Sequence, residues 1–77
     1  MVDTQYKEII EQLKEAEFDL ENAEDSIKEE IKKIRAYLDG NPDEEQFNEL
    51  EFLESRLEDI EEIIEEIEDI ILDFQDS

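Results

Sequence analysis

The only glycine and the only proline of this chain lie two residues apart near its middle, in the segment Asp39-Gly40-Asn41-Pro42-Asp43. Glycine readily adopts the left-handed conformation that ends a helix, and proline suits the first turn of a new one. We expect Asn41 to cap the second helix, in a capping box with Glu44. The segment therefore predicts two helices joined by a turn of about four residues, which forces them to lie antiparallel.

Apolar residues recur three or four positions apart on both sides of this turn, which is the spacing of a helix with one apolar stripe. We expect one domain over residues 1–77, with helices over about 3–39 and 43–75, a turn over 40–42 and a first cap near Asp3. The second stripe alternates strictly, as in a coiled coil, and consists of Leu50, Leu53, Leu57, Ile60, Ile64, Ile67, Ile71 and Phe74. The first has one four-four break after Ala23 that makes it drift around the helix, and consists of Tyr6, Ile9, Leu13, Ala16, Leu20, Ala23, Ile27, Ile31, Ile34 and Leu38.

Three isoleucines lie beside these stripes and widen them. They are Ile10 in the first helix and Ile63 and Ile70 in the second, and an antiparallel hairpin brings them to the same end. A lone hairpin would leave this end partly exposed to water. We therefore predict an all-α antiparallel two-helix hairpin that dimerises into a four-helix bundle. The alternative is a monomer whose widened stripe is itself the site for a partner.

The charge of the chain is strongly negative and unevenly distributed. The net charge is −21, from 28 acidic and 7 basic residues; residues 43–77 hold 16 of the acids and a single base, Arg56. Such a chain is repelled by nucleic acid and by anionic membrane surfaces, so we expect it to bind neither directly. We expect a basic protein surface as its partner. The longest apolar run, Ile70-Ile71-Leu72, is far too short for a membrane span, and we expect a soluble, cytoplasmic protein.

The residues that usually carry catalysis or bind metals are scarce. The chain has no histidine and no cysteine, which removes the commonest general base and the thiolate ligands. The turn superficially resembles a calcium-binding loop, but Glu44 and Leu50 stand where such a loop requires glycine and a bidentate glutamate. We therefore expect no enzyme activity, no cofactor and no metal.

One stretch of the second helix contains only acidic charges. Ten charges over about 27 Å of helix amount to about one per 2.7 Å, against about one per 1.7 Å in duplex DNA. This density favours a non-catalytic inhibitor that occupies the basic nucleic-acid-binding surface of a target protein. In composition the chain resembles small acidic phage proteins that inhibit restriction, CRISPR or repair enzymes by mimicking DNA. The run ends at Asp76, and its candidate binding residues are Glu58, Asp59, Glu61, Glu62, Glu65, Glu66, Glu68, Asp69 and Asp73.

Other interpretations of these acids remain open. An acidic face on a coiled coil is often only a solvated surface. Adaptation to a salty environment raises the acidic content of a whole chain, but six bases in residues 1–42 argue against a uniform adaptation. The main functional alternative is a structural coiled coil, an adaptor, or a chaperone or immunity module for another basic protein.

Two phenylalanines, Phe18 and Phe52, belong to neither apolar stripe and lie among charged or polar residues. Phe18 is surrounded on its helix by Lys14 and Glu21, and Phe52 by Asn48 and Arg56. Burial in a dimer interface accounts for them without a partner. The functional interpretation is that they are apolar anchors within a charged contact surface.

Overall fold

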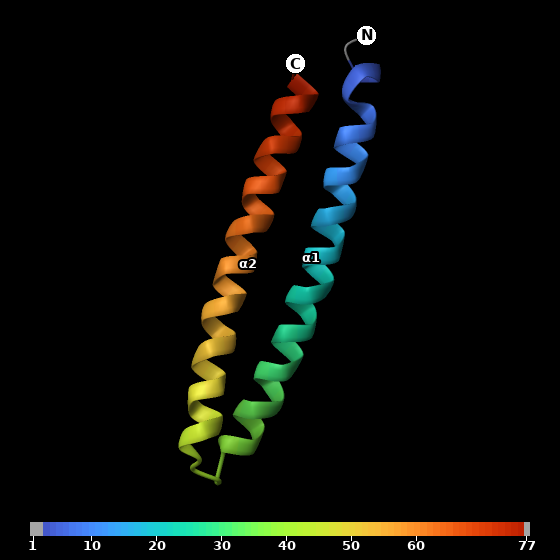
Figure 1. Ribbon diagram of the computed structural model, residues 1–77. Coiled ribbons are helices and arrows are strands. Elements are labelled where there is room, and N and C mark those ends of the chain that lie inside the picture. The colour runs from blue at the N-terminus through green and yellow to red at the C-terminus, as the bar shows by residue number, and fades with distance from the viewer. Residues whose placement is uncertain (1–2, 77) are drawn as a thin grey trace.

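The computed structural model describes residues 3–76 and places the side chains of residues 6–76. It consists of two helices, α1 (Asp3–Leu38) and α2 (Glu44–Asp76), which run antiparallel with both chain ends at one end of the molecule (Figure 1). The predicted all-α hairpin is confirmed. α1 ends one residue before the expected boundary and α2 begins and ends one residue after it. The side chain of Asp3, the predicted first cap, lies outside the described residues.

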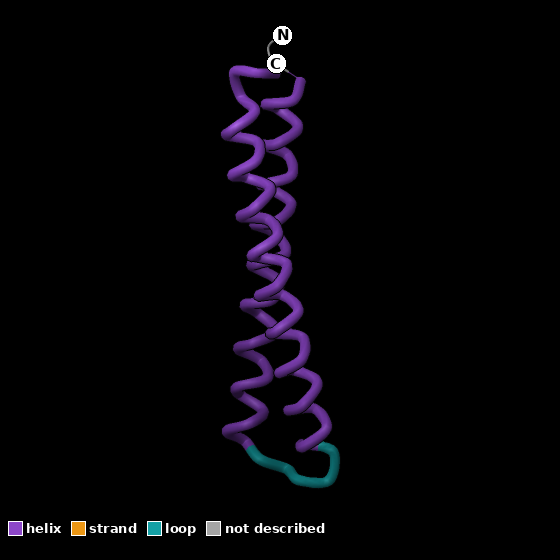
Figure 2. The backbone as a smooth tube through the Cα atoms, turned by 90° about the vertical axis from the view of Figure 1, so that its right-hand side faces the viewer, coloured by secondary structure: helices purple, strands orange, loops and turns teal. Residues whose placement is uncertain are grey.

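The two helices form a rod rather than a globule. Its principal extents are 60 × 14 × 13 Å and its radius of gyration is 17.6 Å, whereas a compact domain of this length has about 11 Å. In the side view of Figure 2, the helices overlap over the upper and middle parts of the rod and stand apart near the loop, which joins them at the end opposite the chain ends. Every buried side chain must therefore lie between the two helices.

The turn follows the predicted course, but its capping residue differs. Gly40 has a φ of 100°, the left-handed conformation expected after a helix. Asp43, and not Asn41, caps α2: its carboxylate Oδ1 accepts hydrogen bonds from the backbone N–H groups of Glu45 at 3.0 Å and Gln46 at 3.3 Å. The Asn41 side chain instead donates to the backbone carbonyl of Tyr37 at 3.0 Å. The predicted capping box at Asn41 is therefore wrong, because α2 begins at Glu44 and its cap is the residue just before.

The core of the rod is the seam, the line of side chains along which α1 and α2 pack. Near the turn it is centred on Ile31, Ile34 and Leu50, which are 5–9% exposed. Farther along, Ile64 and Ile71 are also buried, and the rings of Tyr6 and Phe74 meet with centroids 5.2 Å apart near the open end. All eight predicted seam residues of α2 are buried or half-buried.

The seam of α1 differs from the predicted stripe over its first half. Ile9 is 40% exposed and Ala16 is exposed, whereas Ile10 and Glu17 are half-buried. Half-buried Glu24 extends the same series. The reason is geometric: an unbroken alternation of three and four keeps one face of a helix toward its partner, whatever residues it places there. The observed seam positions are 6, 10, 13, 17, 20, 24, 27, 31, 34 and 38.

Two consequences of the seam concern the wider predictions. Ile10 does not widen the stripe, as the sequence suggested, since it is part of the seam. Ile9 takes that place beside Ile63 and Ile70, which are 43% and 42% exposed. Dimerisation into a four-helix bundle stays a prediction. Neither helix of the described chain carries a stretch that is apolar enough to cross a membrane.

Candidate binding surface

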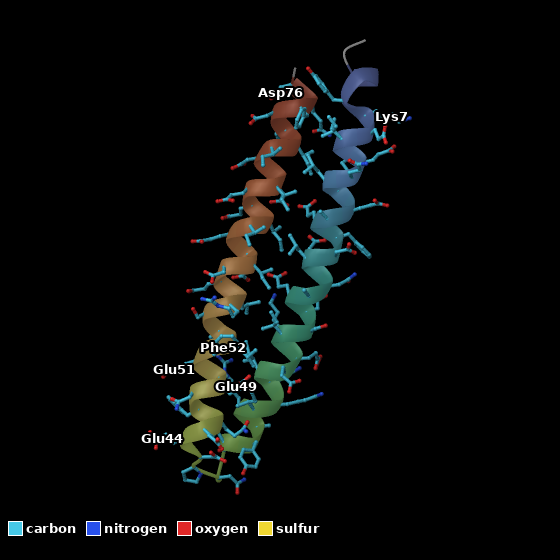
Figure 3. All side chains as sticks on the ribbon, in the orientation of Figure 1. Lys7, Glu44, Glu49, Glu51, Phe52 and Asp76 are labelled. Atoms are coloured by element: carbon cyan, nitrogen blue, oxygen red, sulfur yellow. The ribbon has the colours of Figure 1, made fainter. Side chains whose placement is uncertain are left out.

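The predicted acidic residues of α2 lie on three sides of the helix rather than in one row. Successive residues are about 100° apart, so the seam positions determine where the others point. Figure 3 shows side chains filling the space between the helices and charged ones, such as Glu44 and Glu51, projecting outward. On one side of the seam lie Glu58, Glu61, Glu65 and Glu68, on the other lie Asp59, Glu66 and Asp73, and on the outer face lie Glu62, Asp69 and Asp76.

One of these sides combines with acids of α1 to form an open groove along the middle of the rod. Six of the seven residues that line it are glutamates, and Ile64 of the seam is the seventh. We call this surface the acidic groove. It is lined by Glu21, Glu24, Glu58, Glu61, Glu62, Ile64 and Glu65.

The contribution of α1 to this groove was missed in the sequence analysis. The first helix also contains a stretch without a base, with six acids between Lys14 and Lys28, but the six bases of residues 1–42 masked it in the overall charge of this half. The signal was present in the spacing. Continuing the three-four alternation from Leu13 through Leu20 to Ile27 places positions 17 and 24 at the seam, and both are glutamates.

Glu24 lies at the edge of the seam within the groove, and its side chain is 17% exposed. This partial burial, and next a hydrogen bond with Glu61 of α2, raise the pKa of Glu24 above its ordinary value. The ammonium of Lys28, 4.0 Å from the Glu24 carboxylate, acts in the opposite direction. The middle of the groove therefore holds a carboxyl group that is protonated more readily than an ordinary glutamate.

Glu17 repeats this arrangement two turns closer to the chain ends. A hydrogen bond, in which the protonated Glu17 carboxyl donates to the Glu68 carboxylate, raises the pKa of Glu17, and desolvation and the negative charge of Glu68 add to the shift. The two pairs show that α1 and α2 bring their acids into contact with each other. Crowding, rather than pairing with bases, characterises this face.

The crowding makes the axial density of carboxyl groups on this face nearly that of the phosphates in duplex DNA. Between Glu58 and Glu68, about 15 Å of helix, eight carboxyl groups lie on the groove side of the hairpin, about one per 2 Å, compared with about one per 1.7 Å in duplex DNA. No lysine or arginine occurs in residues 15–27 or 57–77. The eight residues are Glu17, Glu21, Glu24, Asp25, Glu58, Glu61, Glu65 and Glu68.

Basic residues lie beyond both ends of the acidic groove. Toward the turn the surface becomes mixed in charge, with Lys28, Lys32 and Arg35 lining the same side, and Arg35 donates a hydrogen bond across the seam to Glu54. Toward the chain ends, Lys7 and Lys14 line a separate hollow. On this side of the hairpin, the stretch that carries acids without interspersed bases is therefore the central part of the rod.

The structure does not bring the two predicted aromatic anchors together. Phe18 is 62% exposed on the groove side of α1, in a hollow with Lys14 and Asp19. Phe52 is 57% exposed on the opposite side of the hairpin, where the guanidinium of Arg56 stacks over its ring at 5.7 Å from the centroid. Only Phe18 is placed to contact a molecule bound at the acidic groove.

The chemistry available to this surface is that of an array of hydrogen-bond acceptors and negative charges. It attracts guanidinium and ammonium groups, to which carboxylates and phosphates are similar partners. Within residues 3–76, no group of three or more carboxylates is arranged to hold a metal ion. Comparison with models of protein families, with curated proteins and with solved structures finds no match to this chain.

Proposed function

We propose that this protein is a non-catalytic inhibitor that occupies the basic nucleic-acid-binding surface of a target protein. The observation that supports the proposal is the density of the acidic groove. Two helices of a single chain supply carboxylates at nearly the axial density of DNA phosphates, and the base that pairs with one of them, Lys28 with Glu24, lies at the edge of the set. A single run on α2 has a lower density, so the contribution of α1 strengthens the case.

The energetics of the fold also favour a role in binding. Like charges four residues apart on a helix are unfavourable by a few tenths of a kcal/mol per pair. Solubility alone does not require acids without interspersed lysines, since mixed charges keep a surface soluble. Carboxylates on a rigid rod present acceptors to lysine and arginine side chains as phosphate oxygens do. In this proposal Glu58, Glu61, Glu65 and Glu68 act as phosphate surrogates, with Phe18 as an apolar contact at the edge.

The proposal holds for a monomer and for a dimer. The exposed isoleucines Ile9, Ile63 and Ile70 lie on the side of the seam away from the acidic groove. A homodimer formed through them would leave one groove free on each chain.

Two charge-reversed variants test the proposal. Glu61→Lys with Glu65→Lys changes the groove, and Asp69→Lys with Asp76→Lys makes the same change in net charge on the outer face of α2. Immobilised wild-type protein should capture its target from a host lysate at low salt and release it to added duplex DNA or RNA. Binding should weaken steeply as salt rises. The groove variant should lose the captured protein and the outer-face variant should retain it.

Two results would contradict the proposal. One is capture of the same protein by the groove variant as efficiently as by the wild type, with both variants showing an unchanged helical circular dichroism spectrum. The other is a captured protein that nucleic acid does not displace.

A structural coiled coil, an adaptor, or a chaperone or immunity module is the alternative, and the exposed isoleucines favour it. Their energy of contact comes from removing apolar surface from water, which salt does not weaken. A complex that resists high salt and ignores nucleic acid therefore indicates the adaptor.

A further inference from the structure

The side of the hairpin away from the acidic groove carries a row of apolar residues. Each residue of the row comes one position before a seam residue, so it points sideways from the seam rather than into it. The isoleucines are 40–43% exposed, Ala16 is exposed and Ala23 is half-buried. We call this surface the apolar strip, which consists of Ile9, Ala16 and Ala23 of α1 and Ile63 and Ile70 of α2.

The strip is continuous because the two helices bring their halves together. The contacts of Glu17 with Glu68 and of Glu24 with Glu61 show how the two helices are aligned. In this register, residues 9–23 of α1 lie alongside the stretch of α2 that contains both isoleucines. It is about 21 Å long from Ile9 to Ala23. It ends toward the turn at Arg56, which pairs with Asp59 at 2.9 Å.

The two helices bury only part of their apolar surface against each other, so a third helix could bury more of it. No side chain in the described part of the chain is fully buried. At Glu17 and Glu24, α1 contributes a carboxylate to the seam instead of an apolar side chain. Single exposed isoleucines are ordinary on protein surfaces, whereas a continuous row is typical of an interaction site.

Acidic residues border the strip and indicate which helix it takes. Along each edge of the strip, acidic residues lie on the side away from the seam. They are Asp19 on α1 and Asp59, Glu66 and Asp73 on α2. We infer that the apolar strip is a docking site for an amphipathic helix of a basic protein. Such a helix carries apolar residues at heptad spacing, and its flanking lysines and arginines reach the acidic borders while their aliphatic stems cover the isoleucines.

Charge favours a basic helix over a second copy of this chain as the occupant, so this inference departs from the homodimer predicted from the sequence. Two strips packed face to face would bring the acidic borders of both copies together, in an assembly of two chains that each carry −21. Arg56, the base at the end of the strip, is already engaged by Asp59 and by the ring of Phe52. A basic helix replaces this repulsion with attraction on both edges.

A synthetic peptide tests the inference without knowledge of the natural partner. The probe is a helix of about three heptads, with leucine at the a and d positions and lysine at the flanking positions. Its control is a peptide of the same composition in scrambled order, which keeps the charge and loses the apolar stripe. Fluorescence anisotropy of the labelled peptides, titrated with the full chain at moderate salt, measures the two affinities.

The patterned peptide should bind about tenfold or more tightly than the scrambled one, because only it buries the isoleucines. Ile63→Ser with Ile70→Ser should remove this difference, and Ile9→Ser on the other helix should reduce it. All three residues are exposed, so circular dichroism should show an intact fold. Glu61→Gln with Glu65→Gln, in the acidic groove, should leave the difference in place.

Each other outcome overturns the inference. Equal binding of both peptides, or binding that the isoleucine variants do not affect, means that charge alone attracts the probe. Concentration-dependent doubling of the mass in sedimentation equilibrium, abolished by the same isoleucine variants and without selective peptide binding, identifies a second copy as the occupant. Neither result bears on the acidic groove, whose own test uses groove variants and nucleic acid.

Discussion

Glu24 on α1 and Glu61 on α2 form a hydrogen bond across the middle of the rod. Glu24 occupies a seam position, where the heptad spacing favours an apolar side chain. Glu17 and Glu68 repeat the arrangement two turns away. Each pair interrupts the apolar seam and at the same time joins the acids of the two helices into one surface. The acidic groove and the limited burial in the hairpin therefore have the same structural origin.

The first prediction concerns pH. Folding raises the pKa of Glu17 and of Glu24 above the values in the unfolded chain, so the folded state binds more protons. Their contribution is complete below the ordinary pKa of glutamate, about 4.3, and is lost as pH rises through the raised values. The thermal midpoint, followed by circular dichroism, should therefore increase as pH falls from neutral toward 5 or so. Added salt should also raise it, by screening the net charge.

Replacing Glu17 and Glu24 by glutamine tests whether the two glutamate pairs cause this pH dependence of stability. The amide stays neutral and still donates a hydrogen bond, so the double variant should be more stable than the wild type at neutral pH and less sensitive to acid. Asp69→Asn with Asp76→Asn removes the same charge from the outer face and should keep most of the pH dependence. A wild-type midpoint that falls in mild acid would mean that ionised carboxylates stabilise the fold.

The second prediction concerns the start of α2. Asp43→Ala removes the acceptor of two backbone N–H groups and should cost about 1 kcal/mol, which lowers the midpoint by about 4–8 °C in a domain of this size. Asn41→Ala removes one exposed hydrogen bond to Tyr37 and should have a smaller effect. If Asn41 proved the costlier of the two in thermal unfolding, the assignment of Asp43 as the cap would be wrong.

The third prediction concerns the turn. No atom comes within 4 Å of a Cβ built on Gly40, so space does not restrict this position and only its φ of 100° does. Gly40→Ala should therefore destabilise the hairpin by about 1 kcal/mol, as measured by urea or thermal unfolding. Gly40→Asn should cost less, since asparagine tolerates the left-handed conformation. Equal stability of the alanine variant and the wild type would show that the turn adopts another conformation in solution.

The fourth prediction distinguishes the two predicted aromatic anchors, Phe18 and Phe52, and it rests on the proposed function. Phe18→Ala should weaken binding of the target at the acidic groove, more visibly at high salt, where charge attraction no longer masks the lost apolar contact. Phe52→Ala is the matched control, because Phe52 lies on the opposite side beneath Arg56. Affinities measured across a salt series for both variants decide the matter. An equal loss in both would mean that the target surrounds the rod.

The sequence by itself determined the hairpin and the seam of α2. Gly40 and Pro42 are unique in the chain and adjacent to capping residues, so local backbone preferences placed the turn. In α2 every seam position from Leu50 to Phe74 is apolar, and residue type and angular position agree. Local signals suffice where both point to the same face.

Only the tertiary structure decided how α1 faces its partner and where the acids gather. Between Tyr6 and Leu20, residue type favoured Ile9 and Ala16, whereas the packing of a long helix against another required the unbroken heptad through Ile10 and Glu17. The acids of α2 form a single run along the sequence, but the rotation of the helix distributes them over three sides. Which side becomes a dense surface depends on the facing residues of α1, and their register is set by the pairing of two helices, a non-local contact that no single stretch of sequence encodes.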